Sequence, residues 1–92
     1  MRPHASADLT ARELMLLRWL AQGARIMRPS TPSSTVHHVQ GPDGRLHLTG
    51  VQQRLVQRMV DARRIVWRED LAAYVITETG VELVARLRRS AA

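Results

Sequence analysis

Apolar and polar positions alternate along this chain with two different periods, and the first stretch has the period of a helix. Leu14, Leu17 and Leu20 recur at three-residue spacing, and Leu16 and Trp19 widen the apolar stripe. Thr10 and Glu13 stand three residues apart, which is the spacing of a capping box at a helix start. Gly23 follows the stripe and is typical of a helix end. The pattern predicts a helix over about 10–22.

Residues 24–48 have a different composition and predict extended structure. A short strand is expected at 24–28, and 29–35 read as a loop because prolines and hydroxyl residues do not sustain a helix. The run 36–40, the turn-rich quartet 41–44 and the run 45–48 together predict a β-hairpin.

The length of the predicted turn also predicts a register for this hairpin. With a four-residue loop, Val39 lies opposite Leu46 and His38 lies opposite His47. Leu46 and Leu48 then point toward the core, because side chains two residues apart share one face of a strand.

A second amphipathic helix is expected at about 50–63. Val51, Leu55, Met59 and Ala62 form its apolar stripe. The opposite side of the helical wheel, with its flank, is polar and mostly amide or cationic; it carries Gln53, Arg54, Gln57, Arg58, Asp61 and Arg64.

The last third of the chain predicts two strands and a third helix. Strands are expected at 65–67 and 74–76, joined by 68–73, with Trp67 and Tyr74 paired across them. A helix over about 78–89 follows the motif Thr77-x-x-Gly80. Its inward residues are expected to be apolar, namely Val81, Leu83, Val84 and Leu87.

These elements predict one α+β domain. A loose N-terminal arm is expected at 1–8 and the folded domain at 9–90. The domain has three helices, a two-stranded wing formed by 65–67 and 74–76, and an extra β-hairpin between the first two helices.

The stretch 55–66 followed by Ile76-Thr77-Glu78-Thr79-Gly80-Val81-Glu82-Leu83 resembles winged-helix regulators of the MarR type. The resemblance implies a small winged-helix domain whose second helix enters a DNA groove.

Residues 24–48 depart from that pattern, because a helix is expected there in a MarR-type domain. The segment 22–26, the residues Asp43-Gly44-Arg45 and the later order of elements are more similar to small winged-helix proteins of the YjhX type, described as toxins. That second resemblance implies the inhibition of a DNA-handling enzyme.

Charge favours a polyanionic partner. Fourteen basic residues, all of them arginine, stand against eight acidic residues and give a net charge of +6. The planar arginine fork suits phosphates and guanine edges. An acidic protein surface is the alternative partner.

Other features exclude several classes of protein. The chain has no cysteine, no apolar run near the length of a membrane span and no apolar core of a signal peptide after Met1, so we expect a cytoplasmic protein without a membrane partner. It has no Gly-x-Ser-x-Gly elbow and no glycine-rich phosphate loop, so we expect neither an enzyme nor a cofactor. His38 and His47 supply too few ligands for zinc, so we expect no metal.

The resulting hypothesis is a transcriptional regulator that binds double-stranded DNA. Gln53, Arg54 and Gln57 would face bases, because glutamine can pair with adenine and arginine with guanine. Three arginines would contact phosphates: Arg58, Arg64 and Arg68. A homodimer is expected, because operators usually hold two half-sites. Its interface is predicted at Leu16 and Trp19 of the first helix and at Leu87.

The rival hypothesis is a protein-interaction module, an inhibitor or adaptor of a bacterial or phage enzyme. Glu69 and Asp70 follow Arg68 at the tip of the predicted wing, and DNA repels carboxylates there. The unusual hairpin at 36–48 favours the same alternative.

Overall fold

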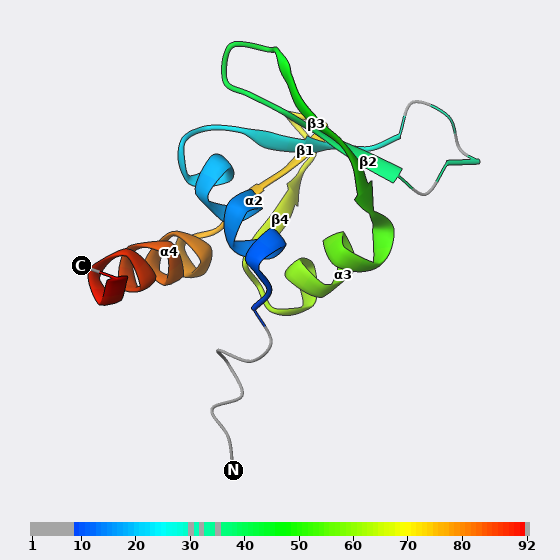
Figure 1. Ribbon diagram of the computed structural model, residues 1–92. Helices are drawn as coiled ribbons and strands as arrows, with labels where there is room; N and C mark the ends of the chain where they lie inside the picture. Colours follow the sequence, from blue (N-terminus) through cyan, green and yellow to red (C-terminus); the bar gives the residue numbers. More distant parts are fainter. Residues whose placement is uncertain (1–8, 30, 32, 35, 92) are drawn as a thin grey trace.

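The computed structural model describes residues 9–29, 31, 33, 34 and 36–91, without the side chains of residues 49 and 91. Three helices and five strands follow one another along the described chain (Figure 1). In order they are α2 Ala11–Ala21, β1 Arg25–Met27, β2 Val36–Gln40, β3 Leu46–Gln52, α3 Gln53–Asp61, β4 Ile65–Arg68, β5 Ala73–Ile76 and α4 Glu78–Ala91. The predicted α+β class is confirmed, and the predicted arm at 1–8 lies outside the described residues.

The five described strands form one antiparallel sheet in the order β3-β2-β1-β5-β4. The short strand β1 joins the two hairpins, because Ile26 pairs with Val39 on one side and with Tyr74 on the other. Helices α2 and α3 lie against one face of this sheet, and α4 packs mainly against α2 (Figure 1). The strands between α2 and α3 confirm the predicted extended region, so sheet and not helix connects the first two helices.

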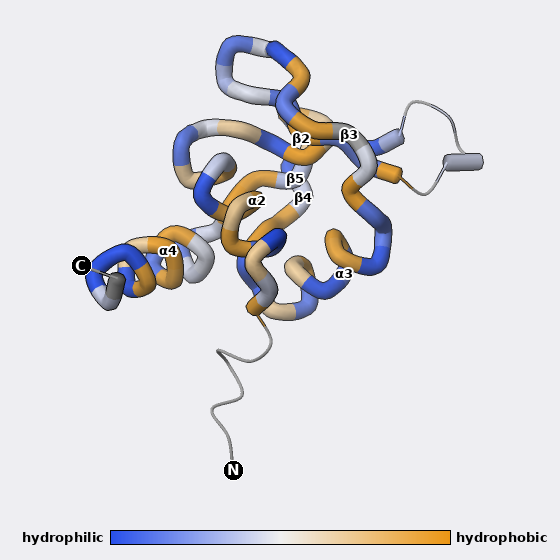
Figure 2. The backbone as a smooth tube through the Cα atoms, viewed as in Figure 1, coloured by the Kyte–Doolittle hydropathy of each residue, from blue (hydrophilic) through white to orange (hydrophobic). Residues whose placement is uncertain are grey.

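The core lies between that face of the sheet and the three helices. Figure 2 shows apolar segments on the central strands and on the helices beside them. The fully or nearly fully buried apolar side chains come from every layer; they are Leu16, Leu17, Leu20, Ala24, Ile26, Val39, Val51, Val56, Met59, Ile65, Ala73 and Val84. Leu16 is therefore a core residue.

Helix α2 begins and ends as its sequence predicts. The Thr10 hydroxyl accepts a hydrogen bond from the Glu13 amide at 3.1 Å, and Glu13 Oε1 accepts one from the Thr10 amide at 3.2 Å. This reciprocal pair is the predicted capping box. Gly23 has a φ of +107°, a value that favours glycine and ends the helix. Ala21 is the last residue of the helix and is exposed.

The β2–β3 hairpin is confirmed, but its predicted register is wrong. Leu46 pairs with Gln40 and not with Val39, whose partner is Leu48. The pairing shifts between Val39 and Gln40, and the Gly41 amide donates to the Arg45 carbonyl at 2.8 Å, so the loop includes Arg45. A shift of one position turns side chains to the opposite face. Leu46 is consequently 58% exposed, and only Leu48 packs against the core.

Helix α3 is shorter than predicted, because β3 continues to Gln52. The pairs Val36–Gln52 and His37–Val51 hold these residues in the sheet. Val51 is buried as predicted, but it reaches the core from a strand and not from a helix. Ala62 lies at the exposed C-cap, outside the helix. The inward side of α3 consists mainly of Val56 and Met59.

The two C-terminal strands are confirmed, each with one further residue. Trp67 pairs with Tyr74, and their ring centroids are 5.1 Å apart in an edge-on arrangement. This contact confirms the predicted aromatic pair across the hairpin.

The Thr77-x-x-Gly80 motif fixes the start of α4 against the turn before β4. The Thr77 hydroxyl donates to the Arg63 carbonyl at 2.6 Å and accepts from the Gly80 amide at 3.1 Å. A Cβ at Gly80 would lie 2.5 Å from the Arg64 carbonyl oxygen, so only glycine permits this approach. Val84 is buried, but Val81 was wrongly predicted to face inward and is 44% exposed.

Candidate functional site

The outward face of α3 carries the side chains that the sequence predicts for DNA contact. Gln53, Arg54 and Gln57 are all exposed, while Val56 and Met59 of the same helix are buried. A shallow open depression runs along this face, lined by Gln52, Gln53, Arg54, Gln57, Arg58 and Asp61. The hydrophobic face of α3 therefore anchors the helix and turns amides and guanidinium groups to the surface.

The polar side chains on this face differ in how they are held. Gln57 donates from Nε2 to Asp61 Oδ1 at 2.9 Å, across one turn of the helix. The Arg54 side chain forms no hydrogen bond or ion pair with the part of the chain that the structure describes. Its guanidinium can therefore meet a ligand without first leaving a partner among these residues.

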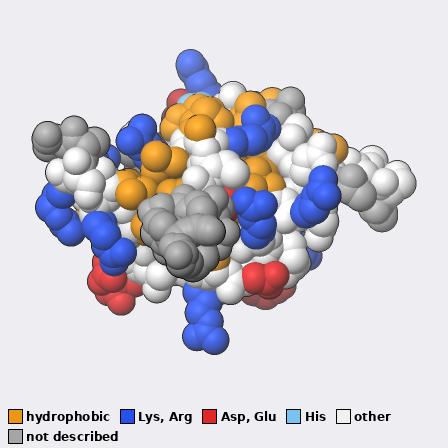
Figure 3. Space-filling model, turned by 60° about the horizontal axis from the view of Figure 1, so that its bottom comes forward, with side chains coloured by type: hydrophobic (Ala, Val, Ile, Leu, Met, Phe, Trp, Pro, Cys, Tyr) orange, Lys and Arg blue, Asp and Glu red, His pale blue; other side chains and the backbone are white. Residues whose placement is uncertain are grey.

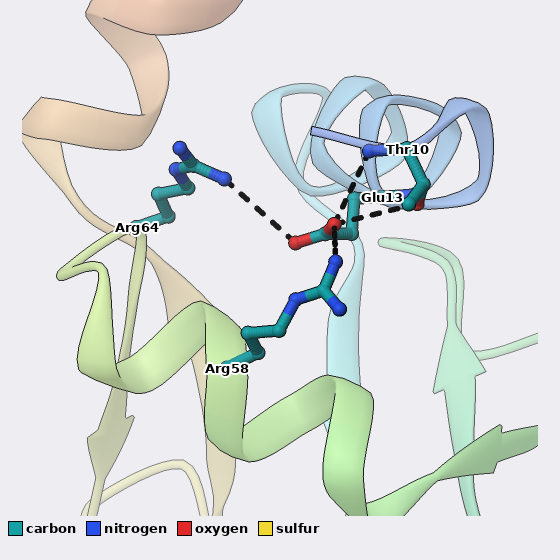
Figure 4. A network of polar contacts seen from close by, with 4 residues as sticks. All are labelled: Thr10, Glu13, Arg58 and Arg64. Carbon is teal, nitrogen blue, oxygen red and sulfur yellow. Dashed lines mark hydrogen bonds and ion pairs between the residues drawn. The ribbon is translucent and has the colours of Figure 1, made fainter. Parts of the chain in front are cut away.

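Arg58 and Arg64 converge on Glu13 (Figure 4). Glu13 Oε1 accepts a hydrogen bond from Arg58 Nη2 at 2.7 Å, and Glu13 Oε2 lies 3.7 Å from Arg64 Nη1. The same Oε1 is 3.3 Å from the Thr10 hydroxyl. The Glu13 side chain is 1% exposed, so the network joins α2, α3 and the turn before β4 through a buried carboxylate.

The two arginines of this network differ in exposure. The Arg58 side chain is 52% exposed and also lines the α3 depression. The Arg64 side chain is only 14% exposed and is directed at Glu13. The structure thus groups Arg58 with the predicted contact residues and places Arg64 apart from them.

The tip of the β4–β5 hairpin holds the third predicted phosphate contact. Arg68 donates from Nε to Asp70 Oδ1 at 2.8 Å and from Nη2 to Asp70 Oδ2 at 2.6 Å. This two-point contact lowers the pKa of the Asp70 carboxyl from its usual value. Glu69 accepts a hydrogen bond from Trp67 Nε1 at 3.2 Å. Both carboxylates at the tip are therefore engaged within the hairpin itself.

The residues predicted for a dimer interface do not form one surface. Leu16 is fully buried in the core of its own chain, so its side chain cannot contact a second copy. Trp19 is partly buried, and its ring centroid lies 5.4 Å from that of His47. Leu87 is partly buried on α4.

Two residues beside the site were missed by the sequence reasoning. Arg12 donates from Nη2 to the Gly50 carbonyl at 3.4 Å, which places a cation beside the end of β3 that leads into α3. Glu13 was identified only as a capping residue. Its neighbours Arg58 and Arg64 are more than forty residues away in sequence, so no local pattern could have indicated the network.

Two broader features concern metals and membranes. In residues 9–29 and 36–91 no three histidine, aspartate or glutamate side chains gather closely enough to hold a metal ion. No helix in the same part of the chain is both long and apolar enough to cross a membrane.

Comparison with known proteins yields no relative: no family model, no curated protein and no solved structure matches this chain. The resemblance to MarR-type and YjhX-type proteins stays a prediction from the sequence.

Proposed function

We propose that this protein is a DNA-binding transcriptional regulator of winged-helix type, with α3 in the major groove of double-stranded DNA. In this proposal α3 is the recognition helix and the β4–β5 hairpin is the wing. Gln53, Arg54 and Gln57 face base edges, where glutamine pairs with adenine and arginine with guanine.

The observation that carries this proposal is the two-sided character of α3. Val56 and Met59 anchor the helix in the core, and the same nine residues present two glutamines and two arginines outward. A short helix fixed on one side and bearing donors on the other fits groove recognition. Arg54, which has no partner among the described residues, is the strongest candidate contact.

The surface around α3 supports phosphate contacts. Arg58 is half exposed beside the depression, and Arg12 contacts Gly50 near the end of β3 that leads into the helix. Figure 3 shows arginine side chains projecting around one face of the molecule and acidic side chains in fewer places. With a net charge of +6, such a surface attracts a duplex and releases its counterions.

The test is the salt dependence of binding to duplex DNA, measured by fluorescence anisotropy. Each phosphate neutralised contributes about 0.9 to the slope of log affinity against log salt concentration. Arg54→Ala is expected to weaken binding by about tenfold, as expected for the loss of one arginine contact to a base. The matched control is Arg45→Ala, which removes the same charge in the loop before β3, at the end of this strand that is far from α3.

The control must retain near-normal affinity for the proposal to hold. If both variants bind as wild type, or if wild type binds no duplex at low salt, α3 is not a DNA-reading helix.

A protein-interaction module is the second candidate, and one observation favours it. All three arginines predicted for phosphate contact face carboxylates of their own chain: Arg58 and Arg64 face Glu13, and Arg68 faces Asp70. Absence of DNA binding at low salt, together with a stable folded chain, would select this candidate over the regulator.

A further inference from the structure

The buried carboxylate of Glu13 is an unusual neighbour for a surface arginine. Burying a charged group is costly unless opposite charges and hydrogen bonds compensate it. Here Thr10 supplies two donors and the guanidinium groups of Arg58 and Arg64 supply the opposite charge. The hydrogen bonds of the helix cap therefore hold the carboxylate at the position where Arg58 contacts it.

Contact with a fixed carboxylate restricts the orientation of Arg58. A guanidinium group is planar and carries five donors in a rigid fork. Arg58 directs Nη2 at Glu13 Oε1 from 2.7 Å, and half of its side chain stays exposed at the depression along α3 (Figure 4). A side chain oriented before binding loses less conformational entropy when it meets a ligand.

We propose that Glu13 is a positioning residue, which orients the Arg58 guanidinium at the edge of α3 for a phosphate of the bound DNA. This inference rests on the proposed function of α3. It adds that the carboxylate of α2 strengthens DNA binding although its own charge is negative.

The direction in which one substitution changes the DNA affinity distinguishes this positioning role from an effect of net charge alone. Glu13→Gln keeps the side-chain oxygen that caps α2 but removes one negative charge, so the net charge rises from +6 to +7. Charge alone predicts tighter binding to a polyanion. If Glu13 positions Arg58, the variant binds the duplex about fivefold or more weakly, because a charge-assisted contact is lost.

The matched control is Glu82→Gln on α4, an exposed position with the same change of charge. Its affinity for the same duplex is expected to equal or exceed that of wild type. Tighter binding by both variants would overturn the positioning role.

A second variant tests the same role without touching the buried carboxylate. Arg58→Lys keeps the charge but lacks the planar fork, so it is expected to weaken binding as Glu13→Gln does. Combining Glu13→Gln with Arg58→Ala should cost no more than Arg58→Ala alone, since the two residues act together. Additive losses in the double variant would overturn the inference. Wild-type affinity of Arg58→Lys would overturn it too, even if Glu13→Gln does not fold.

Failure of this inference differs from failure of the proposed function. If Arg54→Ala weakens DNA binding while Arg58→Lys does not, α3 binds DNA without the help of Glu13. If Arg54→Ala has no effect, the DNA proposal itself is wrong and the positioning role falls with it.

Discussion

One arginine–carboxylate pair lies beside α3 and another lies at the tip of the β4–β5 hairpin, and their acidic partners differ in burial. Both have short contacts, 2.7 Å for Arg58–Glu13 and 2.6 Å for Arg68–Asp70. Both arginine side chains are about half exposed, at 52% and 50%. The carboxylates differ, because Glu13 is 1% exposed and Asp70 is 61% exposed. The length of an ion pair therefore says little about its role, and the burial of its acidic partner says more.

The physical reason is competition with water. Asp70 is solvated and only two residues from Arg68, so their pair mainly neutralises charge and stabilises a turn. Glu13 is shielded from water and linked to elements far apart in the sequence, so its pairs fix the positions of α2, α3 and the turn before β4. We therefore treat the first pair as local and the second as part of the architecture of the site.

The largest predicted effect tests this contrast through stability. Glu13→Ala removes half of the capping box and leaves the largely buried Arg64 guanidinium without its carboxylate. We expect a loss of about 2–4 kcal/mol in the free energy of unfolding, measured by urea denaturation. The matched variant Asp70→Ala should unfold at nearly the same urea concentration as wild type, because its pair is solvated. Equal losses in the two variants would contradict the contrast.

Local signals in the sequence predicted much of this fold. The Thr10–Glu13 cap, Gly23 at the helix end and the Trp67–Tyr74 pair depend on residues close in the chain or in adjacent strands. The start of α3 was predicted too early, since pairing with β2 holds Val51 and Gln52 in the sheet. Such pairing overrides helical periodicity and cannot be read from one segment alone.

The candidate site shows the same difference between features set by local sequence and features set by contacts between distant residues. Gln53, Arg54 and Gln57 face outward as predicted, because the helical period holds throughout α3. Arg64 does not, because the helix ends at Asp61 and Arg63 adopts a φ of +61°, after which that period no longer applies. The partner of Arg58 lies 45 residues away, a distance at which sequence spacing contains no information on contact.

A smaller effect is predicted at the hairpin tip and concerns DNA affinity. Asp70→Asn removes the charge that holds Arg68 and leaves the guanidinium free to meet a phosphate. We expect tighter binding to duplex DNA, with the slope of log affinity against log salt increased by about 0.9. The double variant Asp70→Asn with Arg68→Ala should lose that gain. An unchanged slope in Asp70→Asn would show that the tip does not approach the duplex.

The smallest predicted effect is the response of the hairpin tip to acid. Hydrogen bonds from Arg68 lower the pKa of Asp70 in the folded chain relative to the unfolded chain. A carboxyl group of this kind stabilises the fold above its ordinary pKa, and the contribution is lost as the pH falls through the lowered value. The Arg68–Asp70 pair should therefore stay intact from neutral pH to the ordinary range of an aspartate and break only below it. An NMR titration of the Asp70 carboxyl carbon should give a midpoint below the ordinary value in wild type and a shift back toward that value in Arg68→Ala. A midpoint that is the same in both proteins would mean that Arg68 does not hold Asp70 in solution, and the tip would then carry two carboxylates without a cation to offset them.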